Sequence, residues 1–136
     1  MEDAVSRYLS ASEAGDIDAV METLAPDVEV VSPISGRMTF RGHADARRLL
    51  TAVYGSLEDL RWREAVGDGD HRVALGDMRV GGLRMTDAMV LELSPDGRIR
   101  RIRPHLRPWL ALTLFAAVVG LKVARHPGVV RRAIPG

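Results

Sequence analysis

Apolar residues in the first part of the chain recur every three to four positions, which is the period of an α-helix. One helix is predicted over residues 3–14. A second is predicted between Asp16, whose carboxylate can accept hydrogen bonds from the free amides of a helix start, and Pro26, which ends the helix. A third is predicted between Gly42 and Gly55. Two consecutive helices are therefore expected before any strand.

Beyond residue 55 the apolar residues alternate with polar ones, as is typical of β-strands. The four alternating segments are residues 59–67, 71–80, 83–94 and 98–106. Turns rich in Gly and Asp separate them, and such turns join neighbouring antiparallel strands. A short apolar run, residues 28–31, adds a strand earlier in the chain. The sequence therefore predicts an antiparallel meander.

These elements define the fold class as α+β. Three N-terminal helices on the concave face of a curved antiparallel sheet enclose a cone, whose interior is either packed with side chains or open as a ligand pocket. With 136 residues, the chain is expected to form one such cone-shaped domain, over residues 1–107. Residues 108–136 are expected to add an apolar helix and a basic tail.

The segment from residue 108 to residue 124 is apolar around its whole circumference. As a helix it would be roughly 26 Å long, shorter than the ~20 residues that usually span a bilayer, and Lys122 interrupts its last turn. An ordinary membrane span is therefore disfavoured. Three roles stay open: a lid over the mouth of the cone, an interface in a dimer, or a contact with a membrane surface.

Charge is divided unevenly along the chain. Residues 97–136 contain nine Arg and Lys and no Asp or Glu, whereas the first 96 residues contain ten basic and eighteen acidic residues, a net charge of −8. Such asymmetry is typical of contact with a membrane surface or an acidic partner. A solvated, arginine-rich strand followed by a basic tail is the alternative interpretation.

Several classes of function find no support in the sequence. Cysteine is absent, which removes disulfides, zinc thiolates and cysteine nucleophiles. The four histidines show no metal-ligand spacing, and neither a glycine-rich phosphate loop nor a GxSxG motif occurs. Aromatic and basic residues do not alternate as they do on a nucleic-acid platform. We therefore expect no metal, no cofactor and no nucleic-acid partner.

Three short stretches resemble a known superfamily. They are RY in the first helix, AGDID before the second helix, and LAPDVEVVSPIS over the short strand, followed later by FRG and DGRI. Together they resemble the cone-shaped superfamily that includes nuclear transport factor two, ketosteroid isomerase and the SnoaL-like polyketide cyclases, and they are most similar to ketosteroid isomerase. The resemblance covers roughly residues 5–106. It implies the fold and not the reaction, because many members have no catalytic activity.

The resemblance assigns roles to three positions. Tyr8 matches the tyrosine that donates a hydrogen bond to the developing dienolate oxygen in the isomerase. Ser32 stands where the isomerase keeps its proton-shuttling aspartate, and a hydroxyl has no pKa near neutrality with which to shuttle a proton. Met89 stands at the place of the protonated aspartate that completes the oxyanion hole. Steroid isomerisation by the family mechanism is therefore not expected.

Asp87 is the candidate acid or base. It lies two residues before Met89 and so on the same face of its strand, among apolar residues that would raise its pKa. The alternative is a hydrated carboxylate at the rim, paired with Arg79 or Arg84. Tyr8 is likewise either a hydrogen-bond donor to a ligand oxygen or a core residue whose hydroxyl reaches water.

Further residues are expected at the wall of the pocket. Trp62 is either an aromatic wall for a flat ligand or ordinary core packing. Asp77 and Arg79 share one face of their strand, similar to the Arg and Asp pair of limonene epoxide hydrolase, although that enzyme's second aspartate would fall at Pro104. The expected ligand-binding residues are Ser32, Trp62, Asp77, Met89, Ile102 and Leu106.

The sequence thus predicts binding of an apolar small molecule that is steroid-, polyketide- or lipid-like. As an enzyme, the protein would perform isomerase- or cyclase-like proton transfer, with Asp87 as acid or base and Tyr8 stabilising an oxyanion. The alternative is a non-catalytic binding or dimerisation module that associates with a membrane surface through residues 108–136. We expect a homodimer. Because MEDAVSRYLS lacks the features of a secretory signal, we expect a cytoplasmic location, either free or peripheral to the membrane.

Overall fold

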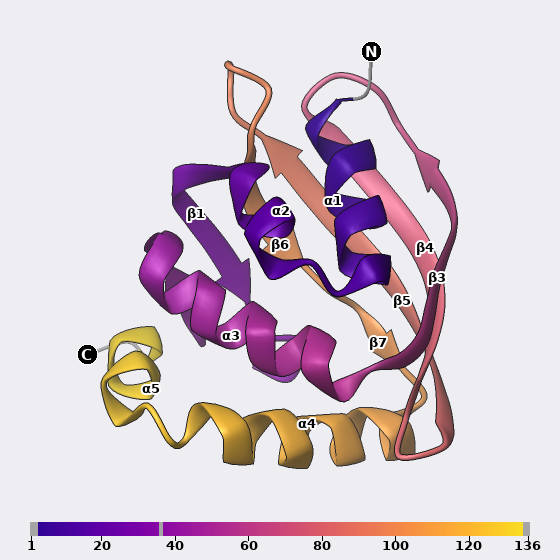
Figure 1. The fold of residues 1–136 in the computed structure, drawn as a ribbon, viewed down its shortest axis with the longest axis vertical. Helices are drawn as coiled ribbons and strands as arrows, with labels where there is room; N and C mark the ends of the chain where they lie inside the picture. The colour runs from indigo at the N-terminus through magenta and orange to yellow at the C-terminus, as the bar shows by residue number, and fades with distance from the viewer. Residues whose placement is uncertain (1–2, 36, 135–136) are drawn as a thin grey trace.

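A computed structural model describes residues 3–35 and 37–134 and contains helices on one side of a curved sheet (Figure 1). The helices are α1 (Ala4–Ala14), α2 (Ile17–Glu22), α3 (Gly42–Ser56), α4 (Trp109–Val123) and α5 (Pro127–Ala133). The strands are β1 (Leu24–Val31), β2 (Thr39–Arg41), β3 (Glu58–Val66), β4 (His71–Val80), β5 (Leu83–Leu93), β6 (Ile99–Arg103) and β7 (Leu106–Arg107). The α+β class predicted from the sequence is confirmed.

The strands form one sheet in the order β2-β1-β6-β5-β4-β3, and β7 pairs with β5 outside this order. From β3 to β6 all neighbours are antiparallel, as the turn residues predicted. Strand β1, however, pairs parallel with β6, so the sheet is mixed and not antiparallel throughout. Both strands are apolar, and an apolar run carries no sign of strand direction.

The first two helices each begin with a hydrogen bond to an aspartate cap. The carboxylate of Asp3 accepts the Ser6 amide at 2.9 Å at the start of α1, and Asp16 accepts the Ala19 amide at 3.1 Å at the start of α2. Helix α2 ends at Glu22, well before Pro26, because Leu24 already pairs with β6. The prediction of a helix reaching Pro26 was therefore wrong: strand pairing overrides the helical spacing of this segment.

The C-terminal segment packs on the same body. Helix α4 lies along α3 and contacts β4, β5 and β7, closing the end of the cone where the β4–β5 turn lies (Figure 1). After it comes α5, a second helix in a segment for which the sequence indicated only a basic tail. Arg132 of α5 donates two hydrogen bonds, at 2.9 and 2.8 Å, to the carboxylate of Asp45 in α3. Among residues 3–35 and 37–134, no helix has the length and apolar content needed to cross a membrane.

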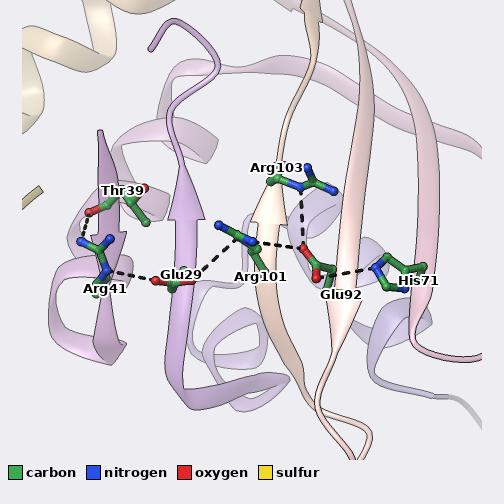
Figure 2. A network of polar contacts seen from close by, with 7 residues as sticks. All are labelled: Glu29, Thr39, Arg41, His71, Glu92, Arg101 and Arg103. Atoms are coloured by element: carbon green, nitrogen blue, oxygen red, sulfur yellow. Dashed lines mark hydrogen bonds and ion pairs between the residues drawn. The ribbon is translucent and has the colours of Figure 1, made fainter. Parts of the chain in front are cut away.

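The two faces of the sheet differ in chemistry. The face toward α1, α2 and α3 is apolar and belongs to the core (Figure 1). The other face carries a row of charged side chains that crosses β2, β1, β6, β5 and β4 (Figure 2). Its members are Arg41, Glu29, Arg101, Arg103, Glu92 and His71. The alternation along each strand therefore separates the apolar interior from a solvated outer surface.

Candidate functional site

A cavity of about 290 Å³ lies between the inner face of the sheet and helices α1, α3 and α4. This volume is at the lower end of the range of small-molecule sites. Most of its wall is apolar, with Met78, Met85, Met89 and Ile102 from the sheet and Phe115 and Val119 from α4. Four kinds of polar side chain also line it: two tyrosines, one aspartate, one tryptophan and one serine hydroxyl.

The two tyrosines form a hydrogen-bonded pair. The hydroxyl of Tyr8 lies 2.6 Å from the hydroxyl of Tyr54, and their rings meet edge to face with centroids 6.2 Å apart. Tyr8 comes from α1, where it is buried, and Tyr54 comes from the last turn of α3; both line the cavity. The sequence analysis missed Tyr54, although it lies four residues after Leu50 and so on the same helical face as that core residue.

Both tyrosines stay protonated at ordinary pH. Burial raises the pKa of Tyr8, the hydrogen bond with Tyr54 lowers it in part, and the charge of Asp87 raises it again. Burial is also the main cause that raises the pKa of Tyr54, and Asp87 contributes in the same direction. One hydroxyl donates to the other, so the pair leaves one neutral O–H that can donate to an oxygen inside the cavity.

Asp87 places a carboxyl group in the same cavity. Its position in β5 faces inward with Met85 and Met89, because residues two apart share a face of a strand. It is 8% exposed, and its Oδ1 accepts a hydrogen bond from the backbone amide of His105 at 3.0 Å. Among the described residues that line the cavity, it is the only carboxylate.

Burial raises the pKa of Asp87 to about 6, and the hydrogen bond from the His105 amide opposes the rise only in part. An interruption between β6 and β7, both of which pair with β5, makes that bond available. The strand predicted over residues 98–106 ends at Arg103, since Pro104 has no N–H to donate to the ladder, and the chain resumes as β7. The amide of His105 then donates to the side chain of Asp87 in β5 instead of to a backbone carbonyl of that strand.

Ser32 lines the cavity, but its hydroxyl forms hydrogen bonds within a turn. Its Oγ accepts hydrogen bonds from the amides of Ile34, at 3.2 Å, and Ser35, at 3.4 Å. This arrangement holds the chain as it leaves β1. The Ser32 side chain therefore stabilises the local backbone.

Trp62 lies in β3, opposite Gly76 of the neighbouring strand β4. Its indole N–H donates to the hydroxyl of Ser12 at 2.9 Å, and its backbone amide donates to Glu13 at 2.7 Å. The ring covers Gly76, where an added Cβ would lie only 2.5 Å from Cε3 of Trp62. Trp62 therefore fixes α1 to the sheet and at the same time forms part of the cavity wall.

The remaining predicted residues divide between the cavity and the surface. Met89, Ile102 and Leu106 line the cavity. Asp77 does not: it is half-exposed and forms an ion pair with Arg63 at 2.6 Å. Its neighbour Met78 faces inward, so strand alternation turns Asp77 outward, and Asp77 lies outside this cavity, unlike the position expected for a ligand-binding residue.

The described residues contain no cluster of three or more His, Asp or Glu side chains that could hold a metal ion. The polar chemistry of the cavity therefore comes from hydroxyl, indole and carboxyl groups. These groups can bind an oxygen-bearing ligand and move a proton.

A family model identifies the family of this chain. The model of the SnoaL-like domain matches residues 5–102, most of the chain. The chain belongs to the SnoaL-like family. No curated protein matches it in sequence.

Solved structures share the fold at low identity. An uncharacterised protein with a cystatin-like fold from Silicibacter pomeroyi DSS-3 has a TM-score of 0.89 at 21% identity, covering 98% of this chain and 95% of its own. A steroid delta-isomerase from Pseudomonas aeruginosa has a TM-score of 0.82 at 20% identity, covering 92% of each chain. A candidate polyketide cyclase from Sinorhizobium meliloti has a TM-score of 0.64 at 26% identity, covering 76% of this chain and 94% of its own.

The match to the Silicibacter protein extends into the C-terminal helices of this chain. The Silicibacter protein covers 98% of this SnoaL-like chain, and the small remainder is too short to contain α4. The shared fold therefore includes the helix that closes the cone, beyond the segment that the sequence motifs alone identified.

Proposed function

We propose that this SnoaL-like protein binds an apolar small molecule carrying a ketone or similar oxygen, and that Asp87 exchanges a proton with it. The observation that carries the proposal is the combination of one buried carboxyl group and a hydrogen-bonded tyrosine pair in an otherwise apolar cavity. An apolar cavity excludes water, and the few polar groups in it then fix the orientation of a ligand.

The proton transfer proceeds between Asp87 and a carbon next to the ligand carbonyl. The carboxylate of Asp87 takes the proton, the C–H electron pair forms a carbon–carbon double bond, and the carbonyl oxygen gains the negative charge of an enolate. An O–H from the pair of Tyr8 and Tyr54 donates to that oxygen. When the ligand is a β,γ-unsaturated ketone, the enolate is conjugated with the second double bond. Asp87 then returns the proton to the γ carbon, the double bond moves to the α,β position, and the carbonyl C=O re-forms. Substrate and product are isomers, so the reaction needs no co-reactant.

The pKa of about 6 suits Asp87 for this work, because a group that titrates near neutral pH both accepts and releases a proton readily. Ser32 cannot replace it, since its hydroxyl is engaged by backbone amides of the turn. The proposed chemistry is thus related to that of the isomerases in reaction class, with the carboxyl group in a different position.

A non-catalytic binding module is the second candidate. It is favoured by Ser32 and Met89, which occupy the two positions that the resemblance assigns to carboxylates in ketosteroid isomerase. In this case the tyrosine pair would hold the ligand oxygen and Asp87 would contribute only polarity.

The test uses a β,γ-unsaturated steroid ketone, whose conjugated product absorbs in the ultraviolet. If the proposal holds, Asp87→Asn keeps the affinity for the ketone within a few-fold and loses ~10² or more in turnover. Asp77→Asn is the matched control, since Asp77 lies outside the cavity, and it should behave as the wild type. Binding without turnover in the wild type would support the binding module, and absence of binding would contradict both candidates.

A further inference from the structure

Helix α4 leaves one apolar face uncovered. Its buried residues, Ala111, Phe115, Val119 and Val123, follow each other every four positions and face the core. At about 100° for each residue, every exposed position falls in a single sector of about 120°. These positions are Trp109, Leu110, Thr113, Ala117, Gly120, Leu121 and Ala124. The sector contains no charged side chain.

The exposed side chains in this sector are large. Trp109 is 75% exposed, Leu121 74% and Leu110 54%. Ile134, just after α5, is 53% exposed. Four of the seven exposed large apolar residues in the described chain therefore lie within residues 109–134, which is a concentration and not a scatter of single residues.

Basic side chains stand before and after the apolar helix in the chain. Arg107 precedes α4, Arg125 follows it and Arg131 lies in α5, and all three are exposed. They form no ion pair with any of the described residues, unlike Arg132, which is bound to Asp45. Because residues 97–136 contain no Asp or Glu, nothing in this part of the chain neutralises them.

This pattern fits an anionic lipid surface better than a second copy of the chain. Two copies joined through α4 would bring the same three arginines together without an acidic residue of this segment to pair with them. A lipid surface instead offers hydrocarbon to Trp109 and Leu121 and phosphate oxygens to the arginines. Tryptophan is also enriched at the boundary between headgroups and acyl chains.

We infer that α4 docks the protein on an anionic bilayer, with the helix axis in the plane of the surface, Trp109, Leu110 and Leu121 among the acyl chains, and Arg107, Arg125 and Arg131 at the phosphates. The polar face that such a helix ordinarily turns to water is replaced here by the protein itself, since the opposite side of α4 packs on α3 and the sheet. The inference rests on the surface of the molecule and not on the ligand or reaction proposed for the cavity.

Sedimentation of the full chain with vesicles tests this inference. One set of vesicles is phosphatidylcholine alone, and the other contains about 30% phosphatidylglycerol as the anionic lipid. The wild type should sediment with the anionic set and much less with the neutral set. A Trp109→Glu, Leu121→Glu double variant should bind at least ~10-fold more weakly, and Arg125→Gln roughly fivefold more weakly.

Val66→Glu is the matched control, because Val66 is an equally apolar, 45% exposed residue at the β3–β4 turn, at the other end of the sheet from α4 (Figure 1). It should bind vesicles as the wild type does. A wild type that stays in the supernatant with both lipid sets, or a double variant that sediments as the wild type, would overturn the inference. So would a lipid-free dimer that the double variant converts to a monomer, since a second copy would then cover this face.

Discussion

The carboxyl group of Asp87 couples folding to pH. Its pKa rises from the ordinary 3.8 to about 6 in the folded protein, chiefly because burial disfavours the carboxylate. Below pH 3.8 the group is protonated in both the folded and the unfolded state and costs nothing. Between pH 3.8 and about 6 the unfolded state releases its proton while the folded state keeps it, so stability falls over this window, and above pH 6 the loss is complete. At ~1.36 kcal/mol for each pKa unit, the full loss is about 3 kcal/mol.

Replacement of Asp87 by Asn should remove this loss. Asparagine keeps an oxygen that accepts the His105 amide but carries no charge. We expect the variant to be more stable than the wild type by up to ~3 kcal/mol near pH 8, and the difference to disappear near pH 4. Urea unfolding of both proteins at the two pH values measures it. A difference that is constant with pH would show that the charge of Asp87 is not its cause.

Periodicity in the sequence predicts on which face a residue lies, but not which distant residue it contacts. Helical periodicity put Tyr8 on an inward face, whereas strand periodicity left Asp87 either inside the cavity or at its rim. The partnership of Tyr8 with Tyr54 could not be predicted, because the two tyrosines are 46 positions apart and meet only through packing. The role of Ser32 in its turn was also not predicted.

At the scale of elements, α4 is one helix with two different apolar faces. Phe115 on the inner face is 6% exposed and lines the cavity, whereas Leu121 on the outer face is 74% exposed. The sequence made both faces equally apolar, so its periodicity could not tell which one the fold would bury.

Alanine substitutions on α4 should separate these faces. Phe115→Ala removes a buried ring from the core and should lower the free energy of unfolding by about 3–5 kcal/mol. Leu121→Ala should change it by no more than ~0.5 kcal/mol, since that side chain is already in water. Chemical unfolding measures both values. Equal losses would mean that α4 is buried on both sides in solution.

At the scale of the whole molecule, the division into residues 1–107 and residues 108–136 does not follow a boundary in the core. Phe115, Val119 and Val123 of α4 belong to the same hydrophobic cluster as the residues of the cone. Helix α5 is tied to α3 by the ion pair of Arg132 with Asp45. The C-terminal segment therefore closes the cavity as part of one packed body.

A chain that ends at Arg107 should consequently be much less stable than the full chain. It loses at least three buried side chains of α4, each of which stabilises the fold by ~1.5–3 kcal/mol, and it opens the cavity to water. Urea unfolding should give a lower midpoint and a less cooperative transition. An unchanged midpoint would identify residues 108–136 as a separable tail.

The sequence by itself determined the class of the fold and the cone with its antiparallel meander, and it made Tyr8 and Asp87 candidates for the interior. These depend on local periodicity and on turns, which adjacent residues specify. Only the tertiary structure decided that β1 runs parallel to β6, that Tyr54 completes the tyrosine pair, that Asp77 faces solvent and that α4 closes the cavity. These depend on contacts between segments far apart in the chain, and such contacts follow from how the apolar surfaces pack together and not from any one stretch of residues.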